Sequence, residues 1–135
     1  MTSSVKTIGA KGTVMEAAEL MVKWKIGSLV IVDGDAPIGI ITEGDISRCV
    51  AKGTNLGSKL SAFTKKKLFT VPLGERVEVA AKLMSDSGVK KLPVMDDGKL
   101  VGIVTQTDIV SSSFSLITSL KEMVRARYRP PDFQM

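Results

Sequence analysis

The pattern of hydrophobic and polar positions occurs twice along the chain, in register. Residues 38–46 read Ile-Gly-Ile-Ile-Thr-Glu-Gly-Asp-Ile, and residues 101–109 read Val-Gly-Ile-Val-Thr-Gln-Thr-Asp-Ile, so that Gly39 and Gly102 lie 63 residues apart. The pair Ala17-Ala18 returns at Ala80-Ala81 with the same spacing and no gap. A fixed period with matched apolar positions indicates two copies of one supersecondary unit. Because a unit of about 60 residues buries too little surface to be stable alone, we expect the two copies to pack together.

Each copy combines helical and strand periodicities in the order strand, helix, strand, strand, helix. Thr13 followed by Glu16 forms a capping-box signature that starts the first helix, and Gly27 is expected to end it. The connection between the second and third strands is too short for a helical crossover, so these strands are antiparallel or joined obliquely. The elements expected in the first copy are strands 5–9, 29–32 and 38–42, and helices 14–25 and 43–52.

The second copy follows a linker, residues 54–67, in which a short helix around Leu60–Phe63 is expected. Its expected elements are strands 68–71, 91–95 and 99–105, helix 76–87, and a helix that starts at 106 and runs on until Pro130-Pro131. The fold class is therefore mixed α/β (α+β), with two tandem βαββα repeats related by pseudo-twofold symmetry and packed through their sheets. The predicted divisions are repeat 1 at 5–53, repeat 2 at 68–111, and a C-terminal helix extension and tail at 112–135.

Composition narrows the function classes. The chain has 135 residues, 44% hydrophobic and 24% charged, as is typical of one globular module, and no apolar run is long enough to span a membrane. It contains no His and a single Cys, Cys49, which excludes an internal disulfide, a structural zinc site and a Ser-His or Cys-His catalytic pair. We expect a cytoplasmic protein with no catalytic and no metal-binding residues. The net charge of +5 favours anionic partners: nucleotide phosphates, nucleic acid or an acidic protein.

Thr-x-x-Asp at the start of a helix has two explanations. It is nearly a capping box, with Asp in place of Glu, and a single copy is most simply structural. Two copies in matching repeats, each delivered by a buried strand, favour a ligand role as well. The run Lys65–Lys67 is most simply a solvated linker, and the basic residues Arg125, Arg127 and Arg129 suit the negative end of a helix dipole.

The order of these motifs resembles a known family. A helix with Ala-Ala-x-Leu-Met, then Gly-Ser-Leu-Val-Ile-Val-Asp or Lys-Lys-Leu-Pro-Val-Met-Asp, then Gly-Ile-hydrophobic-Thr-x-x-Asp-Ile, is similar to the CBS domain. Two in tandem resemble a CBS pair, or Bateman module, over about residues 5–111. The resemblance implies a small stand-alone regulatory protein that binds AMP, ADP, ATP or S-adenosylmethionine in two clefts between the repeats. In such modules the motif Asp binds the ribose hydroxyls, and the Thr contacts ribose or phosphate.

The resemblance also implies which residues line each cleft. Physical chemistry is consistent with those roles, because a carboxylate accepts hydroxyl hydrogens, a helix start offers free backbone N–H groups to phosphate, and lysine supplies positive charge. Cleft 1 would use Thr105, Asp108, Thr7, Ile8, Gly27, Ser28, Leu29, Lys90 and Lys91. Cleft 2 would use Thr42, Asp45, Thr70, Val71, Lys91 and Leu92.

The two clefts are not expected to be equal. Lys90 and Lys91 correspond to Gly27 and Ser28 in the first repeat, so we expect tighter nucleotide binding at Asp108. Gly44 and Thr107 stand where many family members carry Arg, which weakens the case for strong polyphosphate binding.

Partners follow from the same resemblance. CBS pairs usually associate two by two, so we expect a homodimer, a four-CBS disc, and an unidentified regulated protein. The apolar helices are the candidate dimer surface, through Val14, Met21, Leu83 and Met84.

Two alternatives from other classes stay open. One is a basic nucleic-acid-binding or protein-adaptor scaffold that uses the fold without nucleotide, although stacking aromatics are scarce. The other is an enzyme, for which the chain offers no nucleophile–base pair. The particular adenosyl ligand, the number of filled clefts, the dimer's orientation and the role of the basic C-terminal tail are not specified by the sequence.

Overall fold

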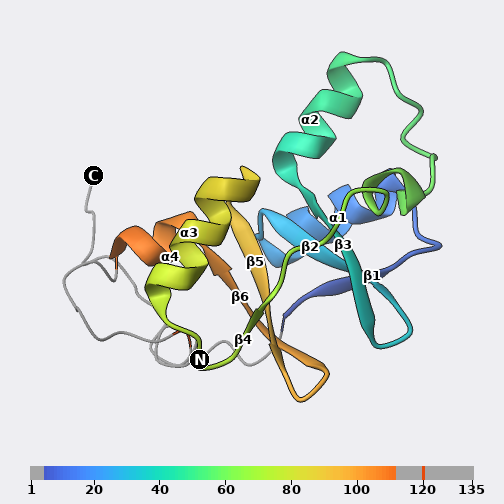
Figure 1. Cartoon of the computed structure of the whole chain (residues 1–135). Coiled ribbons are helices and arrows are strands. Elements are labelled where there is room, and N and C mark those ends of the chain that lie inside the picture. The colour runs from blue at the N-terminus through green and yellow to red at the C-terminus, as the bar shows by residue number, and fades with distance from the viewer. Residues whose placement is uncertain (1–4, 112–119, 121–135) are drawn as a thin grey trace. The chain divides into compact units, whose positions relative to one another are not determined.

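The chain folds into two compact units, one formed by Lys6–Leu68 and the other by Phe69–Met135 together with Met1–Val5. The structure is a computed structural model that describes residues 5–111 and Leu120 (Figure 1). The predicted course of the last helix beyond residue 111 lies outside the described residues, as does the C-terminal extension apart from Leu120.

Both units have the predicted order of strand, helix, strand, strand, helix (Figure 1). The mixed α/β class and the internal repeat are thereby confirmed. In the first unit the elements are β1 (Thr7–Gly9), α1 (Val14–Trp24), β2 (Ser28–Asp33), β3 (Ala36–Thr42), α2 (Glu43–Ala51) and the short 3-10 helix η1 (Leu60–Phe63). In the second unit they are β4 (Val71–Pro72), α3 (Val77–Ser87), β5 (Lys91–Asp96), β6 (Lys99–Thr105) and α4 (Gln106–Ser111).

Each unit contains a three-stranded sheet with its middle strand shared by a parallel and an antiparallel neighbour. The orders are β1-β2-β3 and β4-β5-β6. The outer strands β1 and β4 run parallel to β2 and β5, and the intervening helix supplies the crossover that a parallel pair needs. The strands β2 and β3, like β5 and β6, are antiparallel hairpins. This resolves the alternative left by the sequence in favour of antiparallel pairing.

A single proline makes the two sheets differ at one edge. In the first sheet the Val30 N–H donates to the Lys6 carbonyl at 3.3 Å. The equivalent of Val30 is Pro93, which has no N–H to donate. At the other end of the same strand pair the bond is kept in both repeats, from Ala10 N to Val32 O and from Leu73 N to Met95 O. We attribute to Pro93 the later start of β4, whose first residue is Val71 rather than Thr70.

The core of each repeat lies between its sheet and the inner faces of its helices. In the first repeat α1 buries Val14, Ala17 and Met21 at helical spacing, against Leu29, Ile31 and Ile41 of the sheet. In the second repeat the equivalent buried positions are Ala80 and Met84 on α3, with Leu92, Val94 and Val104. Each fully buried side chain of this size contributes about 1.5–3 kcal/mol of apolar transfer free energy.

These cores correct one expectation about the surface. Val14, Met21 and Met84 are at most 6% exposed and belong to the cores of their own repeats, and Leu83 packs against the second core. The helices expose other apolar residues instead, namely Met15 and Val22 on α1, Val50 on α2, Val79 on α3 and Val110 on α4. The misassignment arises because α1 and α3 carry apolar residues on more than one face.

The predicted linker, residues 54–67, packs onto the first repeat. Leu60 is fully buried in the first core, and its N–H donates to the Gly12 carbonyl at 3.0 Å. The carbonyls of Leu56 and Ser58 accept from the N–H groups of Met15 and Val14, at 2.8 and 3.0 Å. The short helix expected at Leu60–Phe63 is present as η1. This segment therefore caps the start of α1 and covers the edge of β3.

The ends of the helices follow the sequence signals with one exception. Thr13 caps α1 as predicted, its hydroxyl oxygen accepting from the Glu16 N–H at 3.1 Å. The capping box is only half formed, because the Glu16 carboxylate accepts from the Thr13 hydroxyl at 3.3 Å and, among the described residues, not from the Thr13 N–H. Gly88 ends α3 in a left-handed conformation with φ of 74°. At the equivalent place in the first repeat the left-handed residue is Lys25, with φ of 54°, and not Gly27. The helix was expected to end at Gly27, but Lys25 adopts the left-handed conformation that usually falls to glycine. In this conformation the Lys25 N–H donates to the carbonyls of Met21 and Val22 and ends the helix.

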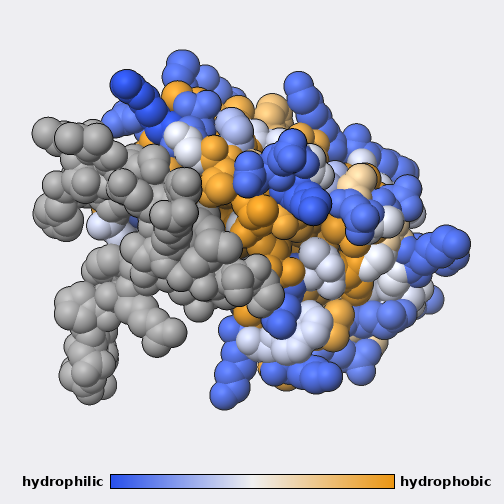
Figure 2. Space-filling model, turned by 90° about the horizontal axis from the view of Figure 1, so that it is seen from below, coloured by the Kyte–Doolittle hydropathy of each residue, from blue (hydrophilic) through white to orange (hydrophobic). Residues whose placement is uncertain are grey.

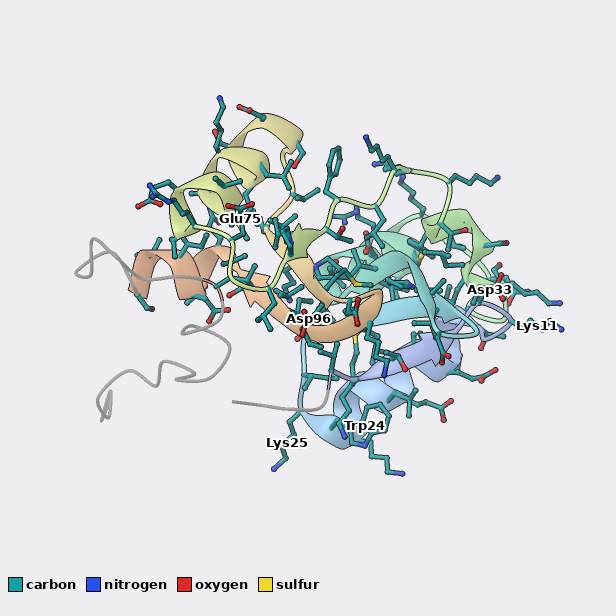
Figure 3. All side chains as sticks on the ribbon, turned by 60° about the horizontal axis from the view of Figure 1, so that its bottom comes forward. Lys11, Trp24, Lys25, Asp33, Glu75 and Asp96 are labelled. Atoms are coloured by element: carbon teal, nitrogen blue, oxygen red, sulfur yellow. The ribbon has the colours of Figure 1, made fainter. Side chains whose placement is uncertain are left out.

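The surface of the first repeat carries one aromatic contact of note. The Lys6 ammonium lies 4.8 Å from the centroid of the Trp24 ring, at the end of α1 where Lys25 turns into solvent (Figure 3). Hydrophobic residues are also visible among the polar ones in the space-filling view (Figure 2). None of the helices in the described part of the chain is long and apolar enough to span a membrane.

Candidate functional site

The Thr-x-x-Asp motif of the first repeat closes the start of α2 as a complete capping box. The N–H and hydroxyl of Thr42 both donate to Asp45 Oδ2, at 2.8 and 3.0 Å. In return the Asp45 N–H donates to the Thr42 hydroxyl oxygen at 3.2 Å. Thr42 has the extended backbone of a helix N-cap. The structural explanation of the motif therefore holds in this repeat, and the carboxylate is held rigidly by it.

The second repeat builds the same cap at α4 with one fewer bond to the carboxylate. The Thr105 N–H donates to Asp108 Oδ2 at 2.9 Å, and the Asp108 N–H donates to Thr105 Oγ1 at 3.1 Å. Both residues are half-buried. In the described part of the chain no hydrogen bond or ion pair reaches Asp108 Oδ1. One oxygen of this carboxylate is thus fixed, and the other has no hydrogen-bond partner among residues 5–111 and Leu120.

Each cap is also tied to the loop before the middle strand. The Glu43 N–H donates to the Gly27 carbonyl at 3.0 Å, and the Gln106 N–H donates to the Lys90 carbonyl at 2.8 Å. The helix starts consequently offer less to a phosphate than expected, because the first and third N–H groups of each helix already have partners. Only the second, at Gly44 and Thr107, makes no hydrogen bond within the described residues.

The strand register places the other predicted site residues beside these caps. Ser28 lies opposite Thr42 at the end of the β2–β3 pair. Thr7 and Ile8 pair with Val30 and Ile31 of the same sheet. Thr7, Ile8, Ser28 and Leu29 therefore lie in the same sheet as Thr42, although they are predicted to line the cleft of Asp108. Gly27 directly precedes this sheet, and Asp45 directly follows it in α2.

The second repeat has the same arrangement. Lys91 lies opposite Thr105, Leu92 opposite Val104, and Val71 opposite Val94. Lys90 is exposed, Lys91 is half-buried, and Thr70 is exposed just before β4. Because the two repeats are described separately, the grouping of residues from both into shared clefts stays a prediction.

Some predicted site residues contribute only backbone or packing. Leu29 and Leu92 are fully buried, Val71 is 3% exposed and Ile8 is 7% exposed, all within the cores of their repeats. Their side chains hold the sheet in place beneath the caps. The predicted site residues whose polar side chains remain at least partly exposed are the motif Thr and Asp of each repeat, Thr7, Ser28, Thr70, Lys90 and Lys91.

Sequence reasoning missed one residue of the site, Arg48. Its Nη2 donates to Asp45 Oδ1 at 2.7 Å, with the Arg48 side chain 64% exposed and that of Asp45 21% exposed. The signal was present in the sequence, because residues three apart on a helix are neighbours. The corresponding position in the second repeat is Ser111, so this ion pair has no counterpart there. The two carboxylates therefore differ in electrostatic environment despite their matching caps.

No group of three or more Cys, Asp and Glu side chains that could hold a metal ion occurs among residues 5–111 and Leu120, and the chain has no His. Cys49 is a free thiol buried in the first core, as expected. The chemistry available at either cap is thus hydrogen-bond acceptance by carboxylate and hydroxyl, with lysine or arginine nearby.

Two known proteins are similar to this chain in sequence over most of its length. The chain is 39% identical over 117 residues to the uncharacterized protein MK0525 of Methanopyrus kandleri, covering 84% of this chain and 60% of that protein. It therefore spans less than two thirds of that relative's length. It is also 30% identical over 116 residues to the CBS domain-containing protein YhcV of Bacillus subtilis, covering 85% of this chain and 83% of the relative.

Two solved structures are similar in fold. One is the CBS domain pair of protein MJ0100 in complex with 5-methylthioadenosine and S-adenosyl-L-methionine, with a TM-score of 0.67 and 32% identity over 83% of this chain and 94% of that one. The other is the CBS domain protein PAE2072 from Pyrobaculum aerophilum complexed with AMP, with a TM-score of 0.72 and 23% identity over 79% and 84%. The second likeness concerns the fold alone.

The family model of the CBS domain matches this chain twice, at residues 1–52 and 60–115, one match for each repeat. The matches contain both Thr-x-x-Asp caps and the strands that carry them. The chain belongs to the CBS domain family, as a tandem pair.

Proposed function

We propose that this chain is a non-catalytic regulatory module that binds an adenosyl ligand, AMP, ADP, ATP or S-adenosylmethionine, with Asp108 as its main ribose anchor. The CBS domain pair of protein MJ0100, which is 32% identical to this chain, supports the ligand class, since its structure is a complex with 5-methylthioadenosine and S-adenosyl-L-methionine.

The state of the Asp108 carboxylate is the observation that carries the proposal. Oδ2 is held by the Thr105 N–H at 2.9 Å, which fixes the orientation of the carboxylate before any ligand arrives. Oδ1 has no hydrogen bond or ion pair among the described residues, and we propose that it accepts from a hydroxyl pair of the ligand. Hydrogen bonds to an ionised acceptor are about twice as strong as neutral ones. A preorganised, half-buried carboxylate therefore suits the ribose diol of an adenosyl compound.

Positive charge beside this cap supports a ligand that carries phosphate or carboxylate. Lys90 is exposed, and its carbonyl is bonded to the first N–H of α4 at 2.8 Å, so its backbone is fixed relative to Asp108. Lys91 follows it at the strand position opposite Thr105. The first repeat has Gly27 and Ser28 at these positions. We expect tighter nucleotide binding at Asp108 than at Asp45 for this reason also.

Regulation by such a module needs a second surface that responds to the ligand, and we propose that a homodimer supplies it. Met15 and Val22 on α1 are 45% and 78% exposed and lie on one face of that helix, seven residues apart. Val79 on α3 is 44% exposed. Light scattering of the full chain tests this part of the proposal, with Val22→Asp as the disrupting variant, since a charge at a buried apolar contact weakens association.

A thermal-shift screen with AMP, ADP, ATP, S-adenosylmethionine and GMP tests the ligand. A ligand at 100 times its Kd stabilises the folded state by about 2.7 kcal/mol, which corresponds to several degrees in Tm. Asp108→Asn removes the charge but keeps an oxygen for the Thr105 cap. Asp35→Asn, on an exposed hairpin, removes the same charge elsewhere.

We expect one adenosyl compound to raise the Tm of the parent chain and of Asp35→Asn, and to lose most of its effect in Asp108→Asn. No shift with any of the compounds would leave both Thr-x-x-Asp motifs as helix caps and would favour the basic adaptor alternative. An equal shift in all three proteins would remove Asp108 from the site.

A further inference from the structure

The first repeat's carboxylate differs from that of Asp108 in having every oxygen engaged. Asp45 Oδ2 accepts two bonds from Thr42, and Oδ1 accepts from Arg48 Nη2 at 2.7 Å. We propose that Arg48 is the charge-selecting residue of the Asp45 site, favouring phosphorylated adenosyl ligands there over neutral ones. This inference rests on the proposed function and adds a specificity to one of its two sites.

The guanidinium of Arg48 lies beside Gly44, at the start of α2. A Cβ placed there would lie 3.4 Å from Arg48 Nη1, 3.6 Å from Nη2 and 3.6 Å from Thr42 Oγ1. The guanidinium and the Thr42 hydroxyl therefore flank the same point, above the first turn of α2. A ligand hydroxyl at Asp45 Oδ1 would share this oxygen with Arg48 Nη2, which lies 2.7 Å from it.

A neutral ligand must displace this guanidinium to use the carboxylate. The displacement is possible, because the Arg48 side chain is 64% exposed and exposed ion pairs are weak. Its cost corresponds to a loss of about two- to fivefold in affinity. The Asp45 site is open to such ligands, but at a disadvantage.

A phosphorylated ligand changes the balance. Only Nη2 of Arg48 has a hydrogen-bond partner within the described residues, which leaves the other guanidinium donors for a phosphate. Arginine binds phosphate through paired, charge-assisted hydrogen bonds. Arg48 then binds the phosphate of a phosphorylated ligand, whereas it competes with a neutral ligand for the Asp45 carboxylate. In the second repeat Ser111 occupies this position, so the same selection is absent at Asp108.

Calorimetric titration with adenosine and with AMP separates these effects. The measurement uses Asp108→Asn protein so that the Asp45 site is observed alone, with and without Arg48→Ser, which installs the residue of the second repeat. We expect Arg48→Ser to tighten adenosine by about two- to fivefold and to weaken AMP by about threefold or more. Lys52→Ser is the matched control, because it removes one exposed positive charge from the end of the same helix.

The ratio of AMP to adenosine affinity decides the outcome. A ratio that falls in Arg48→Ser but not in Lys52→Ser supports the proposal, and a ratio that is unchanged, or falls equally in both, overturns it. Failure of Asp108→Asn to bind either compound, with or without Arg48→Ser, while the parent chain binds, overturns the inference and leaves the proposed function standing. If the parent chain binds neither compound, the proposed function fails and this inference with it.

Discussion

Gly39 occupies a position in β3 where the 3-10 segment approaches the strand closely, and Gly39→Ala tests that approach. A Cβ at this residue would lie 2.8 Å from the Phe63 carbonyl oxygen, 3.1 Å from Thr64 Cγ2 and 3.4 Å from Thr64 Cα. The backbone of Gly39 does not have a positive φ, so the glycine is required by space and not by conformation. Backbone atoms of residues 63 and 64 would have to move to admit one methyl group.

The size of the effect follows from two opposing terms. Overpacking a methyl group against backbone costs about 1–3 kcal/mol. Replacing glycine by alanine restricts the unfolded chain and returns about 0.4–1 kcal/mol. We therefore expect Gly39→Ala to lower the free energy of unfolding by about 1–2 kcal/mol, and the Tm by several degrees.

Urea denaturation followed by far-UV circular dichroism measures this change. Gly9→Ala is the matched control, because Gly9 is also a strand glycine and its Cβ would meet nothing within 4 Å. Adding Thr64→Ser to Gly39→Ala removes the Cγ2 contact but keeps the hydroxyl that bonds the Ser61 carbonyl at 2.9 Å. Since the closest clash is with a backbone carbonyl, this second change should restore only a minor part of the loss. A Gly39→Ala protein as stable as Gly9→Ala would refute the reasoning.

Further stability measurements test other features of the two repeats. Leu60→Ala should lower the free energy of unfolding by about 2–5 kcal/mol, because Leu60 is fully buried in the first core. Lys65→Ala, an exposed position in the same segment, should lower it by less than about 0.5 kcal/mol. Equal effects would mean that residues 54–67 do not pack onto the first repeat. Lys25→Gly should raise the free energy of unfolding by up to about 1 kcal/mol, because glycine adopts the left-handed conformation of this residue without strain. Gly88→Ala should lower it by about 1 kcal/mol at the equivalent end of α3. Changes of the opposite sign in urea denaturation would contradict these backbone conformations. Thr13→Ala should cost about 1 kcal/mol through loss of the α1 cap, and no change in the urea midpoint would show that this cap contributes nothing.

The sequence was sufficient to predict the architecture because each local signal agreed with the repeat. The helical spacing of Val14, Ala17 and Met21 recurs in the second half, and both Thr-x-x-Asp motifs cap helices where expected. The sequence could not predict features that depend on a single missing hydrogen-bond donor or on neighbours that are distant in the chain. One example is Pro93, which has no N–H to donate where Val30 of the first repeat bonds the Lys6 carbonyl. Another example is Lys25, which has the positive φ that ends α1, although Gly27 two residues later is the residue expected to end this helix.

The place of each motif in the fold could be predicted from the sequence, whereas the ligand role of its residues stays a prediction. Thr42 and Thr105 end β3 and β6, and Asp45 and Asp108 lie in the first turns of α2 and α4. The commitment of Asp45 Oδ1 to Arg48 was not foreseen, although the spacing allowed it, because helix-surface ion pairs are common and rarely mark a site. Which carboxylate oxygens are occupied depends on side-chain orientations, and these are set by the cap as a whole.

The contact between Lys6 and Trp24 has a spectroscopic consequence. Trp24 is the chain's only tryptophan and lies in the unit formed by Lys6–Leu68, at the C-terminal end of α1. Its fluorescence therefore reports on the first repeat, whereas the far-UV circular dichroism of the backbone reports on both repeats. If the unfolding curves from the two measurements coincide, the two repeats unfold together in one cooperative transition. If the curves separate, the two repeats differ in stability. The protein carries a built-in label that distinguishes one copy of the duplication from the other.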